Sequence, residues 1–206
     1  MPRDVKHFEK LIKNNPYKVN GNVLGDKNAK VTIELFTDYE CPICRINNVM
    51  INKAVKEVGG IKVEHRNFPL DSKCNKSLQN DFHLNACMYA KYAIAAENQG
   101  KWGIMNDYLF REQPRTEFEI MHVVENSSFD VMKLISDADS NETMNKIQND
   151  IQKGFSYGVN GTPSMIINGK AYPGIKDYKT LKYMLECARD GKEIDLDGRF
   201  HSKKRK

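Results

Sequence analysis

The five cysteines are the residues of this chain whose types and spacing could do chemistry. They stand at positions 41, 44, 74, 87 and 187. The first two form a tight Cys41-Pro42-Ile43-Cys44 motif, the next two are separated by twelve residues, and the last stands alone. Four cysteines could bind zinc, but zinc ribbons join two tight pairs. We therefore interpret the motif as a redox pair rather than a structural metal site, and we assign no metal.

Disulfide exchange at the tight pair needs a thiolate, which a free cysteine with a pKa of about 8.5 scarcely supplies at neutral pH. Pro42 suits the first turn of a helix, which places Cys41 at the helix N-terminus. There, unpaired backbone N–H groups and the helix dipole stabilise an anion. We predict that Cys41 is an acidic, accessible nucleophile and that Cys44, one turn later, is the resolving thiol. The alternative is a pair of structural or metal-bound cysteines.

A strand, a helix and a second strand are expected around the motif. Residues 30–36 are β-branched and apolar, as in a mostly buried strand. From Pro42 onward, apolar residues recur at three- and four-residue spacing, which predicts one apolar helix face. That face comprises Ile43, Ile46, Met50, Ala54 and Val58. Gly59-Gly60 ends the helix, and residues 61–68 alternate as another strand. This order predicts a parallel pair with a right-handed crossover.

The second half of the chain is predicted to contain helices followed by a hairpin. Helical stretches are expected at 84–98, 102–110, 118–125, 130–137 and 142–155, with starts at Ser128 and Asn141 and a break at Pro114. Asn168-Gly169 between the apolar runs 164–167 and 170–172 is a strong hairpin signal, and 177–188 closes as a helix. The fold class is therefore α/β, with an all-helical insertion between a βαβ half and a ββα half.

The chain divides by composition and pattern into five segments. They are an N-terminal lead with a helix at 4–13 (1–17), the βαβ half (18–70), the helical insertion (71–158), the ββα half (159–193) and a basic tail (194–206). Residues 203–206 supply four of the net +5 charges, and no basic stripe lies elsewhere, so we predict no nucleic-acid partner.

Two features of the sequence bear on the cellular compartment of the protein. No apolar run approaches the roughly 18 residues of a membrane span, so we expect a soluble protein. The chain begins Met1-Pro2 without a hydrophobic leader, which means either a cytosolic protein or a targeting or anchor segment missing from this sequence.

An ordered set of motifs resembles the DsbA-like branch of the thioredoxin-fold thiol:disulfide oxidoreductases. The set comprises Leu24-Gly25-Asp26, Phe36-Thr37-Asp38-Tyr39-Glu40-Cys41-Pro42-Ile43-Cys44, Arg66-Asn67-Phe68-Pro69-Leu70 with Cys74-Asn75, His83 with Ala86-Cys87, Gln99-Gly100-Lys101-Trp102, and Val159-Asn160-Gly161-Thr162-Pro163. The likeness is to bacterial members that work with membrane quinone reductases of the DsbB or vitamin K epoxide reductase type. It implies a thioredoxin fold.

The resemblance also implies how substrates are held. Thr162-Pro163 is expected to be a cis peptide facing Cys41, and the extended backbone before a proline can pair with an extended substrate segment. The bland alternative is an ordinary proline that opens a strand.

The remaining cysteines and the histidines are given structural roles. Cys74 and Cys87 are expected to form a disulfide, worth about 3 kcal/mol in the chain-entropy model, in an oxidising compartment; two separate buried thiols are the alternative in a reducing one. Cys187 is interpreted as a packed core residue. The histidines, at 7, 65, 83, 122 and 201, lack metal-ligand spacing, and none is assigned a catalytic role.

Two departures from the family pattern concern the acidity of Cys41. The family usually has a buried carboxylate six residues before the first cysteine, where this chain has Leu35; Glu34 should point to the opposite face of the strand as a solvated carboxylate. Ile43 gives the thiolate neither charge nor donor. The neighbouring Asp38 and Glu40 oppose a thiolate while Arg45 favours one, so we predict a moderately lowered pKa, above the ~3.5 of DsbA.

These observations predict an enzyme that introduces disulfide bonds in exported proteins, with rearrangement of such bonds as a further activity. Its substrates would be extended cysteine-containing chains, its reoxidant a membrane quinone-linked partner, its state monomeric and its location periplasmic or otherwise extracytoplasmic. No cofactor beyond the redox-active disulfide is expected. The lead is too short for the dimerisation domain of isomerases. The alternatives are a thioredoxin-type reductase, or a non-enzymatic peptide-binding module or holdase with a structural CxxC.

Overall fold

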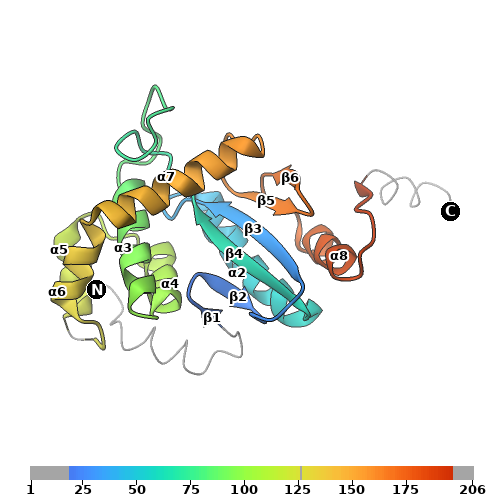
Figure 1. Ribbon diagram of the computed structural model, residues 1–206, viewed down its shortest axis with the longest axis horizontal. Coiled ribbons are helices and arrows are strands. Elements are labelled where there is room, and N and C mark those ends of the chain that lie inside the picture. Colours follow the sequence, from blue (N-terminus) through green and yellow to red (C-terminus); the bar gives the residue numbers. More distant parts are fainter. Residues whose placement is uncertain (1–18, 126, 197–206) are drawn as a thin grey trace.

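The structure, a computed structural model, describes residues 19–125 and 127–196 and is built around one mixed sheet (Figure 1). Within those residues the sheet has the strand order β1-β2-β4-β3-β5-β6. The strands are β1 (Val19–Asn20), β2 (Val23–Gly25), β3 (Val31–Thr37), β4 (Ile61–Asn67), β5 (Ser164–Ile167) and β6 (Lys170–Pro173). β3 and β4 pair in parallel, and the other described neighbours pair antiparallel.

Helices cover both faces of this sheet. They are α2 (Pro42–Val58), α3 (Ala86–Asn98), α4 (Trp102–Glu112), α5 (Glu117–Val124), α6 (Val131–Ala138), α7 (Asn141–Ser156) and α8 (Tyr178–Arg189). α2 and α8 share an apolar core with Ile33 and Leu35, while α3 and α7 pack against Phe36 and Phe68 on the other face. Figure 1 shows α7 crossing in front of the sheet and α2 behind it. The predicted α/β class with a helical insertion is confirmed.

The short strands β1 and β2 were missed by the sequence analysis. They are two and three residues long, too short for an alternating pattern. β2 runs antiparallel to β4 and pairs Gly25 with Lys62. Gly25 has a φ of 101°, and a Cβ there would lie 2.6 Å from the carbonyl oxygen of Ile61. A glycine is therefore required where β2 ends.

The starts of two insertion helices differ from the prediction. α6 is capped by the carboxylate of Asp130, which accepts from the backbone N–H of Lys133, and not by Ser128. α7 is capped by the hydroxyl of Ser140, which accepts from the N–H of Thr143, so Asn141 is its first residue. In both cases an oxygen acceptor stands three residues before an unpaired donor, the arrangement that a helix start requires.

The interface between α7 and β3 overturns the expectation that Glu34 is a solvated carboxylate. Glu34 does point away from α2, but it is only 9% exposed because α7 covers that face. Lys153 of α7 contacts its carboxylate at 2.5 Å, Arg66 donates to it at 2.9 Å, and Tyr157 donates at 3.3 Å. Burial alone would raise the Glu34 pKa, yet the hydrogen bonds from Lys153 and Arg66 hold it below its usual value.

The apolar face predicted for α2 is only partly buried. Ile43 and Ile46 are 42% and 52% exposed, whereas Asn47 and Asn48 are buried. In these first turns α2 packs against α4, where Asn106 donates to the side chain of Asn48. A polar contact across this interface therefore takes the inward positions and leaves two isoleucines outside, next to the redox motif.

Some expectations concern residues outside the described part of the chain. The helix expected at 4–13 and the basic residues 203–206 are among them. Across residues 19–125 and 127–196, no helix combines the length and the apolar character needed to cross a bilayer.

His65 of β4 is a buried titratable residue in the sheet core. It lies opposite Leu35 of β3, it is 3% exposed, and its ring centroid is 4.6 Å from that of Trp102. Neither ring nitrogen has a hydrogen-bond partner among the described residues. Burial lowers its pKa from 6.5 to about 3, so the folded protein keeps this imidazole neutral.

The neutral His65 should make the fold acid-sensitive. Below pH 6.5 the His65 imidazole is protonated in the unfolded chain but stays neutral in the folded chain. The free energy of unfolding therefore falls as the pH drops from 6.5 towards 3. We expect His65→Leu to remove about 2 kcal/mol of the loss between pH 7.5 and pH 5.0, measured by urea unfolding. His122→Gln, a change at an exposed residue, is the control. Equal pH dependence of wild type and His65→Leu would contradict the prediction.

Candidate active site

Cys41 lies in the short connection between β3 and α2. β3 ends at Thr37, and Cys41 is the N-cap of α2 with Pro42 in the first helical position. The sulfur of Cys41 accepts a hydrogen bond from the backbone N–H of Cys44 at 3.4 Å. One of the donors that every helix N-terminus leaves unpaired therefore points at this sulfur.

The surroundings of Cys41 make its thiol acidic. Its pKa falls from 9.0 to about 6, first through the hydrogen bond with the Cys44 thiol, against the opposing effect of burial. The backbone N–H groups of Cys44 and Ile43 and the neighbouring Thr162 lower it further. The shift has the predicted direction and moderate size. Its causes are hydrogen bonds and the helix N-terminus, since the side chain of Ile43 contributes no charge.

Cys44 differs from Cys41 in both burial and acidity. It is 1% exposed, and burial, followed by the neighbouring Cys41 sulfur, raises its pKa above that of an ordinary thiol. The two thiols are free in this structure. Near neutral pH the reduced pair therefore carries its negative charge on Cys41 and its proton on Cys44.

The sulfur of Cys41 is less accessible than the sequence analysis expected. Cys41 exposes only 5% of its surface, which corrects the prediction of an open nucleophile. The carbonyl oxygen of Thr162 lies 3.7 Å from its sulfur. The cap position sets the sulfur against the backbone of this neighbouring loop.

The loop at Thr162-Pro163 reaches Cys41 through strand pairing. The peptide bond between these two residues is cis. β5 follows the loop directly and pairs antiparallel with β3, with Ser164 opposite Phe36. Because Phe36 lies at the end of β3 that leads to Cys41, this register brings together two segments 121 residues apart in sequence.

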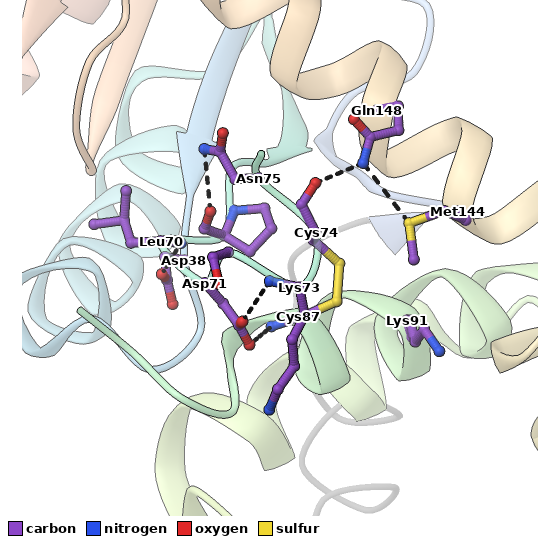
Figure 2. Close-up of a disulfide and its surroundings, with 12 residues drawn as sticks. Asp38, Leu70, Asp71, Lys73, Cys74, Asn75, Cys87, Lys91, Met144 and Gln148 are labelled. Atoms are coloured by element: carbon purple, nitrogen blue, oxygen red, sulfur yellow. Dashed lines mark hydrogen bonds between the residues drawn. A yellow bond between two sulfur atoms is a disulfide. The ribbon is translucent and has the colours of Figure 1, made fainter. Parts of the chain in front are cut away.

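Cys74 and Cys87 form a disulfide at the base of the insertion (Figure 2). Their Cα atoms are 5.5 Å apart. The carbonyl of Cys74 accepts a hydrogen bond from the side chain of Gln148 on α7 at 2.5 Å. The bridge therefore joins the loop before α3 to α3 itself and contacts α7. Cys187 is buried in α8 and free.

Two carboxylates beside Cys41 have partners that sequence reasoning missed. Asp38 Oδ2 lies 2.9 Å from Nδ1 of His83, and Asp38 also accepts from the backbone N–H of Leu70 at 2.8 Å. Glu40 accepts from the backbone and side-chain N–H groups of Asn85 at 2.7 and 3.2 Å. A histidine and an asparagine two positions apart were the only sequence signal. That signal does not reveal contacts made across more than forty residues.

Arg45, which was expected to favour the thiolate, is an exposed residue of the first turns of α2. With Asn48, Val49 and Arg111 it lines a cavity of about 270 Å³ between α2 and α4. Among the described residues, no group of three histidine, cysteine or carboxylate side chains is arranged to bind a metal ion.

Comparisons with known proteins place this geometry in a family. A family model described as thioredoxin matches residues 18–187. The Na⁺/H⁺ antiporter NhaA 3 of Salinispora tropica is 25% identical over 154 residues, which are 74% of this chain and 22% of that protein. The probable disulfide bond formation protein D of Bacillus anthracis is 28% identical over 176 residues, 79% of this chain and 76% of that protein. The chain spans about a quarter of the length of the antiporters that it matches.

Solved structures share the fold. A thioredoxin-like oxidoreductase from Silicibacter pomeroyi superimposes with a TM-score of 0.69 at 22% identity, covering 88% of this chain and 97% of that one. The thiol-disulfide exchange protein α-DsbA2 from Wolbachia pipientis gives 0.65 at 21% identity, covering 88% and 92%. The predicted thioredoxin fold is thereby confirmed.

The asymmetry between the two sulfurs predicts a selective reaction. In protein reduced only at the Cys41–Cys44 pair, we expect the rate of iodoacetamide alkylation at Cys41 to reach half its maximum near pH 6. Cys44 and the buried Cys187 should react far more slowly, as measured by peptide mass spectrometry. A half-maximum at or above the ~8.5 of free cysteine would contradict this account of Cys41 acidity.

Proposed function

Because the chain belongs to the thioredoxin family over its residues 18–187, we propose that it is a DsbA-like thiol:disulfide oxidoreductase that introduces disulfide bonds into exported proteins. The observation that carries the proposal is the unequal acidity of the pair, with a lowered pKa at Cys41 and a raised one at Cys44. Its likeness to a Bacillus disulfide bond formation protein supports the same activity.

The first step is attack on the oxidised pair. A substrate thiolate attacks the sulfur of Cys41, a new substrate–Cys41 disulfide forms, and the electron pair of the broken bond leaves with Cys44. Cys44 then takes up a proton, since burial raises its pKa. Cys41 is the more exposed of the two residues, at 5% against 1%, which favours attack there.

The second step releases the oxidised substrate. A second substrate thiolate attacks the substrate sulfur of the mixed disulfide, and Cys41 departs as a thiolate. The lowered pKa of Cys41 makes it a good leaving group. The same stabilisation of the reduced form makes the oxidised pair a better oxidant, which favours the oxidase direction over the reductase direction.

The substrates are proposed to be extended, cysteine-containing polypeptides. The backbone of Thr162 lies beside the sulfur of Cys41 and can pair with an extended chain. Ile43, Ile46 and Val49 lie on the exposed side of α2 that begins at the redox motif. They offer apolar contacts to a chain that is not yet folded, without demanding a particular sequence.

The cycle closes when another protein reoxidises the pair. We propose a membrane quinone-linked partner of the DsbB or vitamin K epoxide reductase type, which accepts two electrons as the Cys41–Cys44 disulfide reforms. No cofactor besides this disulfide is needed. The Cys74–Cys87 bridge fits an oxidising, extracytoplasmic compartment. We propose that the enzyme acts as a monomer.

Loss of the resolving thiol should trap substrates. With an unfolded substrate that carries a single cysteine, and with an oxidant, Cys44→Ala is expected to accumulate mixed disulfides at Cys41, because neither Cys44 nor a second substrate thiolate can displace the bound chain. Cys41→Ala should accumulate none, and Cys187→Ala should behave as wild type. Non-reducing electrophoresis with peptide mapping identifies the adducts. If Cys44→Ala forms no adduct, the pair is a structural staple.

The equilibrium of the pair against glutathione tests the direction. A Cys41 pKa of about 6 lies between those of thioredoxin, about 7, and DsbA, about 3.5. We therefore expect a reduction potential of about −230 mV, between that of thioredoxin (about −270 mV) and that of DsbA (about −120 mV). Mass spectrometry of acid-quenched glutathione mixtures measures it. A value near −270 mV, about that of thioredoxin, would instead indicate a reductase.

A further inference from the structure

Negative charge surrounds the nucleophile on its N-terminal side. Asp38 and Glu40 stand three and one residues before Cys41. The side chain of Asp38 has no exposed surface, so water does not screen its charge. An unbalanced buried carboxylate this close would oppose the Cys41 thiolate.

Both carboxylates are bound by one short segment, residues 83–85. His83 contacts Asp38 through Nδ1 at 2.9 Å, and Asn85 donates twice to Glu40. The contacts differ in kind. Asn85 supplies neutral donors, whereas a protonated His83 supplies a positive charge that can balance Asp38.

The segment is anchored by the Cys74–Cys87 disulfide loop. Asp71 accepts from the backbone N–H of Cys87 at 3.2 Å and from that of Lys73 at 2.9 Å (Figure 2). The backbone N–H of His83 donates to the carbonyl of Leu70 at 3.2 Å. The N–H of Leu70 donates in turn to Asp38. Leu70 and Asp38 thus contact His83 directly, and the Cys74–Cys87 bridge closes the loop that contains it.

We propose that His83 is a positioning residue for the redox reaction: held by the Cys74–Cys87 loop, it balances the buried charge of Asp38 and thereby stabilises the Cys41 thiolate. This inference rests on the proposed role of Cys41 as nucleophile. It gives a chemical role to a histidine that the sequence analysis left without one. It also gives the second disulfide a function at the active site.

The charges that face His83 favour its protonated form. The hydrogen bond that its ring donates to Asp38 raises the pKa of His83, and the negative charges of Asp38, Cys41 and Glu40 raise it further, against the effect of burial. Two other charged residues lie near residues 83–85 in the chain. Lys73 donates to the carbonyl of Leu84, and Asp81 accepts from the backbone N–H of Ser72. Imidazolium and thiolate therefore coexist between about pH 6 and the raised pKa of His83.

Removal of the charge should make Cys41 less acidic. Gln at position 83 can still donate to Asp38 but carries no charge, and Asp38 keeps its bond from Leu70. We expect His83→Gln to raise the midpoint of Cys41 alkylation by about one pH unit, roughly a tenfold slower reaction at pH 5.5. His83→Lys, which retains a positive charge, should recover most of the Cys41 acidity that His83→Gln loses. His122→Gln on α5 is the matched control.

A second set of variants tests whether the Cys74–Cys87 bridge positions His83. The double variant Cys74→Ala/Cys87→Ala should also raise the pH midpoint of Cys41 alkylation. In that background, His83→Gln should raise the midpoint by less than it does with the bridge intact, and a double-mutant cycle measures the difference. A purely structural bridge would lower the melting temperature without moving the midpoint. Full additivity of the two changes would overturn the anchoring role.

A measurement on the wild-type protein keeps the proposal falsifiable if the variants fold poorly. Coupling between two charges is reciprocal, so the pKa of His83, followed by NMR of its ring, should be higher with the pair reduced than with it oxidised. Equal values in the two states, or an unchanged Cys41 midpoint in His83→Gln, would overturn the proposal. The outcome is independent of the Cys44→Ala trap, whose failure would remove only the proposed enzymatic activity.

Discussion

The whole site depends on a sulfur atom held at the start of a helix. The backbone N–H of Cys44 points at the Cys41 sulfur from 3.4 Å, and Pro42 occupies the position where a missing N–H costs nothing. The first turn of α2 contains no acidic residue. A carboxylate there would compete for the same unpaired donors and repel the thiolate.

The fold brings the second part of the site to this sulfur by strand pairing. Antiparallel pairing of β5 with β3 sets the Thr162 carbonyl beside Cys41. The helical insertion between them must therefore end where β5 can begin. Its last helix, α7, lies closely against the sheet, because Gly154 leaves room for Phe36 and Phe68; a Cβ on Gly154 would lie 2.9 Å from the Phe68 ring. Lys153 and Glu34 add an ion pair to this contact.

Local patterns predicted the position of Cys41 at a helix N-terminus, the alternation of elements and the hairpin, because each depends on adjacent residues. Contacts between distant segments were beyond such patterns. The spacing of Ile43 and Ile46 indicated a helix face but not that Asn48 would face α4 instead. Glu34 was assigned to the correct face of β3, yet its burial depends on Lys153 and Tyr157, more than a hundred residues away.

Asp38 has two opposing effects in the turn before α2. Asp38 is needed there because its carboxylate accepts from the backbone N–H groups of Glu40 and Leu70 and so fixes the approach to the helix. The same carboxylate disfavours a thiolate three residues on. A neutral residue in place of Asp38 would weaken the turn. The charge of Asp38 is instead balanced by His83, which lies outside the turn. Because Ile43 adds no charge of its own, the thiolate is stabilised chiefly by hydrogen bonds. Cys41 is therefore more acidic than a free cysteine without reaching the extreme acidity of DsbA.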